Sequence, residues 1–326
     1  MLTERPEDDP SPDQPRTLSP VRSRPDRAFR ALLAACAVIV LAMIAAIALK
    51  LCLDARPALL YSGHRFLTSD RWNPKSLHPT YGILGVLMGS LLVAVVALVP
   101  ALAVSVATAL LINEYAPVWM RGALTALVDL LAALPSVIFG LWGLRLLSTE
   151  VDGLSRWLSH HADFIPIFQV PQGNYGNSIF VCSLVVAAMI VPVIASIGRE
   201  VMAQVPRDQC EAALALGGTR WGMVTDVILP FARRGIVAAA LLGLGRAMAE
   251  TIAVALILAG NNTLWRQILA PGGGTISALI AQQFTGLPAR GQSALILAGL
   301  TLFAATLLVN LAARALVVRR VTPVGR

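Results

Sequence analysis

The stretch EAALALGGTRWGMVTDVILP, residues 211–230, lies between two strongly apolar segments and keeps a helical pattern. Small and apolar residues recur there at helical spacing, namely Cys210, Ala213, Leu214 and Gly217. This spacing predicts a short helix ending at Gly217, a residue suited to the positive φ of a helix end. Thr219 can cap a second short helix, which we expect to run to about Ile228 and to stop at Pro230. So small a helical pair cannot bury its own apolar face, so we expect it to dock on a partner outside the bilayer.

The composition excludes an ordinary soluble protein. The 326 residues are 56% hydrophobic and 13% charged, with a mean hydropathy of +0.72, whereas soluble chains carry about 25% charged residues. The net charge of +8 is dispersed between apolar runs, which favours anchoring at the cytoplasmic membrane surface over binding of nucleic acid. The four cysteines lie in or beside apolar runs or directly before the quoted stretch, and we interpret them as small apolar fillers.

Six apolar segments have about the 20 residues needed to cross a bilayer core of ~30 Å. They cover Ala31–Leu49 and roughly 83–112, 124–147, 179–197, 236–259 and 293–318. The sequence therefore predicts an all-α membrane domain over 31–320, followed by a short end at 321–326. We expect Pro135 and Pro192 to be tolerated inside the third and fourth spans. Residues 1–30 are rich in proline and mixed charges, which predicts a disordered tail.

Positive charge predicts the orientation of the spans. With the first 30 residues inside, the inside segments hold Arg5, Arg16, Arg22, Arg24, Arg27, Arg30, Arg121, Arg199, Arg207, Arg220, Arg233, Arg234, Arg314, Arg319, Arg320 and Arg326. The outside segments hold Arg56, Arg65, Arg71, Lys75, Arg156, Arg266 and Arg290. This excess predicts that both termini and residues 211–230 are cytoplasmic.

The sequence contains no recognisable catalytic motif. Neither lysine ends a P-loop pattern, so ATP would have to be bound by another subunit. The four histidines lie in outside loops without metal-ligand spacing, and no nucleophile–base arrangement is legible. We expect no catalytic or metal-binding residue and no cofactor in this chain. The glycine-rich stretch 271–275 is interpreted as a flexible turn outside the membrane.

Arg246 is the sharpest chemical feature of the sequence. It lies about ten residues, or ~15 Å, into the predicted fifth span, where a charge costs about 2.5–3.5 kcal/mol on insertion scales. Glu250 follows four residues later and is expected to share its helical face. A guanidinium group suits bidentate contact with a tetrahedral oxyanion. A static ion pair that holds helices together is the other interpretation.

The quoted stretch resembles the EAA loop of bacterial ABC-importer permeases, the coupling helix that docks on the ATPase. The match rests on Glu211, Ala212, Ala213, Gly217, Leu229 and Pro230. Val227 departs mildly from the isoleucine that is usual there. The resemblance implies that these six residues form the ATPase-coupling site and that the fold is that of a type I ABC importer permease, whose core covers about 83–318.

Further fragments are similar to the PstC-type permeases of phosphate-specific ABC importers. They are Phe66–Ser69, Trp72–Pro74, Tyr81–Ile83, Ser90, Asn113–Tyr115, Leu134–Val137, Phe139–Leu141 and Gly243–Thr251. This resemblance covers about 31–318, and the Trp-Asn-Pro loop favours PstC over the sister permease PstA. It implies that Arg246 and Glu250, with Thr251, lie on the substrate pathway.

The resemblance also implies the assembly and its location. Its partners would be a PstA-like permease, two PstB-like ATPase subunits that bind ATP and Mg²⁺, and a PstS-like extracytoplasmic phosphate-binding protein. Membrane lipid surrounds such a permease in the bacterial inner membrane. The expected function is ATP-driven import of inorganic phosphate. A permease for sulfate or molybdate, and an ATP-independent channel or secondary transporter, remain as alternatives.

Overall fold

The computed structural model describes residues 24–162, 164–170, 175–258 and 267–319. The chain divides into two units, residues 1–50 and 51–326. The predicted tail falls mostly on residues 1–23, outside the described residues. Helix α1 (Arg24–Ser62) already includes residues 24–30, so the prediction of disorder is wrong for them. Pro25 lies in the first helical turn, where a missing N–H is harmless, and no proline follows before Pro57.

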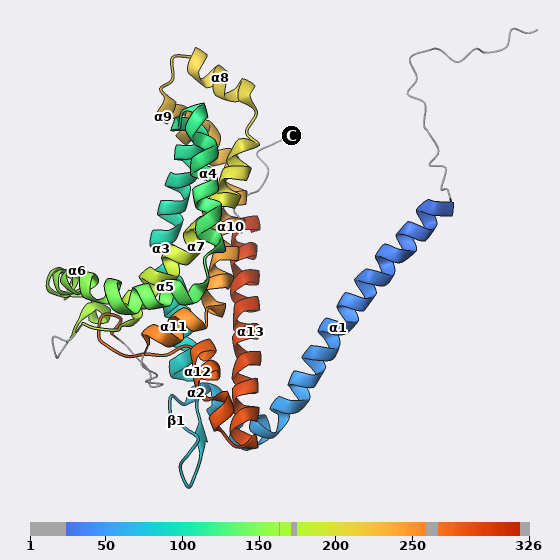
Figure 1. The fold of residues 1–326 in the computed structure, drawn as a ribbon, viewed down its shortest axis with the longest axis vertical. Coiled ribbons are helices and arrows are strands. Elements are labelled where there is room, and N and C mark those ends of the chain that lie inside the picture. Colours follow the sequence, from blue (N-terminus) through green and yellow to red (C-terminus); the bar gives the residue numbers. More distant parts are fainter. Residues whose placement is uncertain (1–23, 163, 171–174, 259–266, 320–326) are drawn as a thin grey trace, which may run out of the picture. The chain divides into compact units, whose positions relative to one another are not determined.

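Four long helices and one broken pair form the membrane region of residues 51–326 (Figure 1). The long helices are α3 (Leu84–Leu110), α7 (Ile179–Ala203), α10 (Leu229–Ala249) and α13 (Ala289–Arg319). The broken pair is α4 (Val118–Ala133) and α5 (Ser136–Trp142). With α1, the described residues contain five helices that can span a membrane, or six if the broken pair counts as one span. The all-α fold class is confirmed, and six spans are reached only in this sense.

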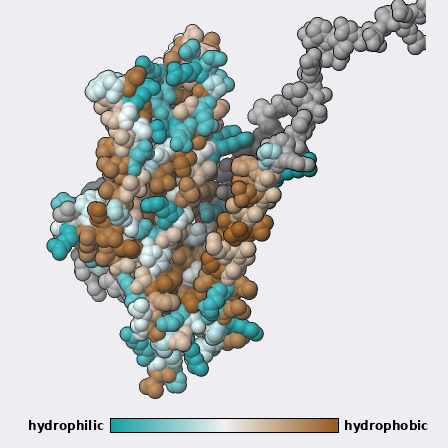
Figure 2. All heavy atoms as spheres, turned by 45° about the vertical axis from the view of Figure 1, so that its right-hand side comes forward, coloured by the Kyte–Doolittle hydropathy of each residue, from teal (hydrophilic) through white to brown (hydrophobic). Residues whose placement is uncertain are grey.

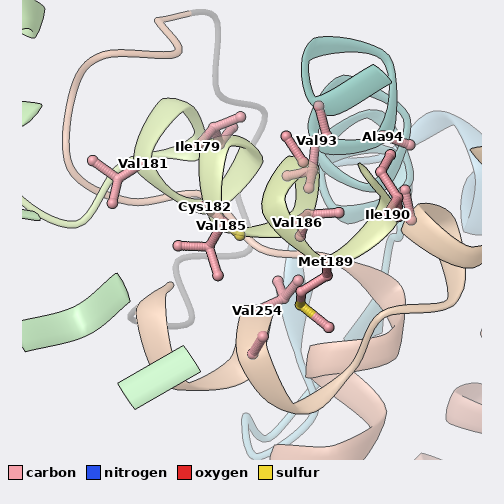
Figure 3. Packing of buried hydrophobic residues seen from close by; sticks show 14 of the residues in the cluster. Val93, Ala94, Ile179, Val181, Cys182, Val185, Val186, Met189, Ile190 and Val254 are labelled. Carbon is pink, nitrogen blue, oxygen red and sulfur yellow. The ribbon is translucent and has the colours of Figure 1, made fainter. Parts of the chain in front are cut away.

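The core of the bundle forms where α7 packs against α3 and α10. Figure 3 shows Val93 and Ala94 of α3 and Val186 and Ile190 of α7 among the buried residues, with Val254 of α11 (Ile252–Ile257) close by. Glycine allows close approach to α10, because a Cβ at Gly243 would lie 2.6 Å from the Cδ1 atom of Ile194. Figure 2 shows broad apolar areas along the middle of the bundle and more polar residues towards its ends.

The predicted third span is not one helix. The helix axes before and after Leu134-Pro135 differ by 88°, and both residues have extended backbone. Pro135 has no N–H to donate, and its ring disfavours helical geometry at Leu134. Beyond the break the chain runs through α5, the π-helical turn η2 (Gly143–Leu147) and α6 (Ser148–His161). Figure 1 shows this segment lying across the bundle rather than along it.

Pro230 does not end the helix in which it lies, contrary to the prediction. Helix α9 (Arg220–Met223) continues through the π-helical turn η4 (Val224–Ile228) into α10, giving one apolar helix over Arg220–Ala249. In the wider π turn the N–H of Leu229 bonds to the carbonyl of Val224. The backbone hydrogen bonds are thus shifted by one residue directly before Pro230. A regular α-helix would have needed an N–H at Pro230, which proline lacks.

Short elements cover the end of the bundle opposite α8 (Arg207–Ala215), which Figure 1 shows at the other end. They are α2 (Arg65–Thr68), the hairpin of β1 (Trp72–Asn73) and β2 (Thr80–Tyr81), η3 (Pro166–Phe168), α12 (Ile276–Gln283) and η5 (Phe284–Gly286). In the antiparallel hairpin, Trp72 pairs with Tyr81. The turn η1 (Leu111–Tyr115) prolongs α3 at the end near α8.

The glycine-rich stretch 271–275 is packed rather than flexible. Gly272 and Gly273 have φ values of 121° and 94°, and residues 272–275 are buried. A Cβ at Gly89 of α3 would overlap the carbonyl oxygen of Gly274. The hydroxyl of Ser90 accepts a hydrogen bond from the N–H of Ile276 at 3.0 Å. The predicted flexible turn is therefore wrong: the stretch packs against α3, and this close backbone contact requires glycine at position 89.

Candidate substrate pathway and coupling site

The helix that carries Arg246 ends at Ala249, so the predicted single span over 236–259 is wrong. Glu250 has an extended backbone (φ −65°, ψ 127°), and α11 begins only at Ile252. The N–H of Glu250 donates to the carbonyl of Ala247 at 3.3 Å, and the hydroxyl of Thr251 donates to the carbonyl of Ala249 at 3.1 Å. The break exposes polar backbone at a depth where the sequence predicted continuous helix.

The break also overturns the predicted contact between Arg246 and Glu250. Side chains four residues apart meet only on a continuous helix, and here the helix ends before Glu250. Within the described residues, the structure has no ion pair between the two. Arg246 instead lies in the last turn of α10, where unpaired carbonyls form the negative end of the helix dipole. The negative end of a helix dipole therefore lies near the guanidinium in this chain, a position that favours a cation.

The side chain of Arg246 lies on the surface of this chain. It is exposed, while its neighbours Ala247 and Met248 are buried in the core. Arg246 lies twelve residues beyond Arg234, and therefore about 18 Å further along α10 from the end near α8. An arginine at the middle of a bilayer is unfavourable against lipid tails. The exposed face of Arg246 must therefore meet a polar cavity or another protein chain.

Polar side chains near the break were not recognised from the sequence. An ideal Cβ at Gly245 lies 3.8 Å from the amide nitrogen of Asn310 on α13. The hydroxyl of Ser277 donates to the carbonyl of Met248 at 3.3 Å, and the amide of Gln282 donates to the carbonyl of Ala255 at 3.0 Å. The last two bonds tie α12 to the residues on either side of the break. An isolated asparagine in the apolar run of α13 was the available signal for Asn310.

Asp129 is a further ionisable residue inside a predicted span, and its sequence context did not predict a role for it. It is exposed on α4 and accepts a hydrogen bond from the hydroxyl of Ser196 on α7 at 3.1 Å. Ionisable residues within spans usually face a cavity or a partner. Asp129 therefore joins Arg246 as a candidate for a site on the surface that this chain presents to others.

The residues of the predicted coupling helix form the turn that the sequence indicated. Helix α8 ends at Ala215, and Gly217 has a φ of 86°. The hydroxyl of Thr219 accepts a hydrogen bond from the N–H of Gly222 at 3.1 Å and caps α9. Both local predictions are confirmed, because glycine and threonine act here through their own backbone neighbourhoods.

The two faces of α8 differ. Cys210 and Ala213 are partly buried against the ends of α3 and α7, whereas Leu214 and Gly217 are exposed, so the four residues at helical spacing are divided between the core of this chain and its surface. Glu211 and Ala212 are exposed, Leu229 is half-buried and Pro230 is exposed. Leu216 and Trp221 are 90% and 62% exposed, so this end of the molecule offers an apolar surface that the sequence pattern did not predict.

A charged cleft of about 320 Å³ lies behind α8. It is lined by Asn113, Glu114, Arg121, Met202, Ala203, Val205, Arg207, Cys210 and Glu211. Burial raises the pKa of the Cys210 thiol, and the carboxylates of Glu114 and Glu211 raise that pKa further. The amide of Asn113 donates to the carbonyl of Arg199 at 2.8 Å. The cleft thus joins the end of α3 to α8, and Glu211 faces charges of its own chain as well as solvent.

A second cleft, of about 310 Å³, lies beside the hairpin at the opposite end. Its lining is Trp72, Asn73, Pro74, Lys75, Gln282, Gln283, Gly286 and Leu287. The indole N–H of Trp72 donates to the amide oxygen of Gln283 at 2.8 Å, and the ring of Trp72 packs edge-on against Tyr81. The Trp-Asn-Pro fragment therefore shapes a surface that reaches α12.

Comparison with known proteins gives the family. Residues 101–322 match the family "Binding-protein-dependent transport system inner membrane component". The chain belongs to this family. It is 38% identical over 301 residues to the phosphate transport system permease protein PstC 2 of Mycobacterium tuberculosis, covering 90% of this chain and 92% of that protein. It is 36% identical over 302 residues to PstC of Xylella fastidiosa, covering 91% and 92%.

Solved structures of importer permeases share the fold of this family member. A chain of a bacterial ABC transporter involved in the import of the acidic polysaccharide alginate is 17% identical, with a TM-score of 0.61, covering 92% of this chain and 97% of that one. A chain of the MetNI methionine ABC transporter is 18% identical, with a TM-score of 0.50, covering 74% and 96%. The predicted type I ABC importer permease fold and the resemblance to PstC-type permeases are confirmed, and the chain is a multi-pass transport subunit.

Proposed function

We propose that this chain is the PstC-type permease subunit of an ATP-driven importer that moves inorganic phosphate into the bacterial cytoplasm. The observation that carries the proposal is Arg246, an exposed guanidinium in the last turn of α10 beside the break at Glu250. Guanidinium binds tetrahedral oxyanions through paired hydrogen bonds. The PstC relatives, which cover nine-tenths of the chain and are named for phosphate transport, support phosphate over other oxyanions.

The exposed face of Arg246 calls for a second membrane subunit. A central arginine and the Asp129 carboxylate are both unfavourable against lipid tails, so a PstA-like permease would cover this surface and complete a polar pathway. Glu250 and Thr251 would line the pathway at the break. Because Glu250 does not pair with Arg246 in this structure, it is free to limit how tightly an anion is held. A conducting site must be weak enough for release.

The apolar end formed by Leu216 and Trp221, together with Glu211, Ala212, Ala213 and Gly217, would receive a PstB-like ATPase that binds ATP and Mg²⁺. Leu229 and Pro230 would take part by connecting this surface to α10. A PstS-like binding protein would deliver phosphate to the opposite end. The excess of arginine in the segments on the α8 side supports an orientation with both termini cytoplasmic.

Uptake in a strain that lacks its own phosphate importers tests the cargo. The chain is expressed with its second permease, ATPase and binding protein, and uptake of labelled phosphate, sulfate and molybdate is measured. Phosphate uptake alone is expected. Restored sulfate or molybdate uptake without phosphate uptake would contradict the proposal.

The energy source needs its own control. An ATPase variant that lacks the P-loop lysine should abolish uptake, because this chain is proposed to depend on ATP hydrolysed by its partner. Flux that persists with this variant would instead favour a channel or a secondary transporter. Charge reversal by Glu211→Lys should leave membrane insertion intact and weaken ATPase binding.

A further inference from the structure

Helix α6 divides its surface into three sectors. The sector that faces the protein contains Val151, Ser155 and Ser159, all buried. A second sector contains Asp152, Arg156 and His160. A third contains Leu154, Trp157 and His161, all exposed. At about 100° per residue, the three sectors lie about 120° apart.

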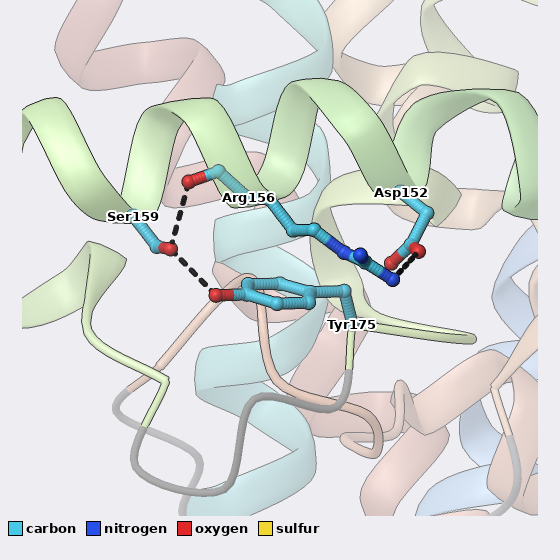
Figure 4. A network of polar contacts seen from close by, with 4 residues as sticks. All are labelled: Asp152, Arg156, Ser159 and Tyr175. Carbon is cyan, nitrogen blue, oxygen red and sulfur yellow. Dashed lines mark hydrogen bonds and ion pairs between the residues drawn. The ribbon is translucent and has the colours of Figure 1, made fainter.

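The charged sector fastens α6 to the chain that enters α7 (Figure 4). Arg156 forms an ion pair with Asp152 at 2.6 Å and lies 5.9 Å from the ring centroid of Tyr175. The hydroxyls of Tyr175 and Ser159 are 2.7 Å apart, and the Ser159 hydroxyl also donates to the carbonyl of Arg156 at 3.0 Å. These contacts fix the rotation of α6 about its own axis.

The same contacts fix the depth of α6. Tyr175 precedes the α7 N-cap, Ser178, by three residues, and the long apolar run of α7 starts directly afterwards. Tyr175 therefore lies near the membrane boundary. The segment formed by η2 and α6 begins at Gly143. A Cβ at Gly143 would overlap Val185 of α7, and Val185 lies six residues, or about 9 Å, inside that boundary. The segment slants through the shallow depth at which interfacial helices lie.

The apolar sector has the chemistry of a membrane surface. Trp157 and Leu154 are 55% and 48% exposed, and the Trp157 ring stacks on His161 with 4.7 Å between ring centroids. Tryptophan is enriched at lipid–water interfaces because its ring is apolar and its N–H is polar. Leu141 and Trp142 of the preceding α5 segment, which belongs to the broken span, are also exposed apolar residues.

We propose that α6 lies in the lipid–water interface on the side opposite α8, with Leu154 and Trp157 towards the acyl chains and His160 towards water. The protein-facing sector has the apolar sector on one side and the charged sector on the other. Lipid is the occupant that fits this arrangement. The anchored segment continues into α5, where a Cβ at Gly140 would lie 2.8 Å from the Cα atom of Ala253 on α11. Anchoring of α6 thus holds the helix that follows the Glu250 break. The placement does not depend on which anion is carried.

Spin-label accessibility tests the placement in the assembled transporter, reconstituted into phosphatidylethanolamine–phosphatidylglycerol nanodiscs. The four native cysteines are replaced, and single labels are introduced by Leu154→Cys, Trp157→Cys, Gly153→Cys and His160→Cys. We expect a several-fold higher ratio of oxygen to water-soluble nickel accessibility at 154 and 157 than at 153 and 160. Equal ratios at all four positions would place the helix in water. Labels at 154 and 157 shielded from both reagents would place a protein partner on this face. Either result would overturn the proposal.

Tryptophan quenching gives a second readout without labels. Lipids brominated near the glycerol end of the acyl chain should quench wild-type fluorescence more than the Trp157→Phe variant. Trp221→Phe is the matched control, because Trp221 is similarly exposed but lies at the opposite end beyond α8, and its loss should not reduce lipid quenching. If Trp157→Phe leaves the quenched signal unchanged, the proposal is wrong.

Discussion

The two ends of α10 differ in how the helix meets the chain beyond it. At the end near α8, α9 and α10 form one helix that passes through Pro230. At the other end, the helix stops at Ala249 although neither proline nor glycine stands at Glu250 or Thr251. The first end is a continuous helical connection from a surface turn into the bundle. The second is a joint whose backbone polar groups lie at the depth of Arg246. Under the proposed function, the ATPase acts on α10 at the first end and substrate passes at the second.

The largest effect is expected at the joint. Arg246→Gln should lower phosphate uptake by about ten- to a hundredfold, because a hydrogen bond to a charged group contributes about 1.5–3 kcal/mol. Complex yield should stay near wild type, since the side chain is exposed in this chain. Arg234→Gln, on the same helix but near the end that is continuous with α9, is the control and should keep uptake. Uptake and yield are measured side by side.

The double variant Arg246→Gln/Glu250→Gln sharpens the same point. Because the structure has no ion pair between these residues, removing the second charge should not restore transport. A transporting double variant would mean that the two residues pair in a functional state, and that the pathway role is wrong.

An intermediate effect is expected at Gly217, in the turn between α8 and α9. Gly217→Val forces a branched residue into the left-handed region, at a cost of about 1–2 kcal/mol. We expect up to about tenfold weaker ATPase association, measured by co-purification, with unchanged membrane insertion. Gly222→Ala is the control, because a Cβ there meets the Thr219 hydroxyl at an ordinary 3.5 Å. Equal loss in both variants would show that the turn geometry is not responsible.

A smaller effect is expected from the cap of α9. Thr219→Ala removes the acceptor for the Gly222 N–H and should cost about 1 kcal/mol. The apparent Tm of the solubilised complex should fall by about 2–4 °C, and Thr219→Ser should recover most of this loss. A larger fall with serine than with alanine would contradict the capping role.

The smallest effect concerns the thiol behind α8. Burial and the two nearby carboxylates raise the pKa of Cys210, so the thiolate fraction at a given pH lies below that of an ordinary cysteine. Glu114→Gln should lower this pKa and shift the pH profile of maleimide labelling to lower pH, in a complex where the other three cysteines are replaced. A shift to higher pH would show that Glu114 does not face the thiol.

Local chemistry explains what could be predicted from the sequence. Gly217 and Thr219 were placed correctly because a helix end and a cap depend on a few neighbouring atoms. The spans of α3 and α7 followed from the length of their apolar runs. The length of an apolar run and its number of charges do not tell whether the helix is continuous, however, so the sequence did not predict the breaks at Pro135 and Glu250.

Non-local packing accounts for the remaining errors. Pro135 breaks a helix, whereas Pro192 lies inside α7 and Pro230 follows a π turn in a helix that continues, and composition does not reveal this difference. The stretch 271–275 has the composition of a flexible turn, and its packing is hidden because Gly89, which contacts Gly274, is far away in the sequence. The site residues Arg246 and Glu250 were found as charges, but their relation to each other depends on the backbone between them.

The π turn at 224–228 makes the orientation of the α8–α9 surface depend on chain length. A π turn accommodates one residue more than an α-helical ladder. Deleting one residue from this turn would rotate Trp221 by about 100° about the axis of α10. It would also bring Pro230 back into register with a carbonyl that needs an N–H. A single residue in this turn thus sets the direction in which Trp221 points from this end of the protein.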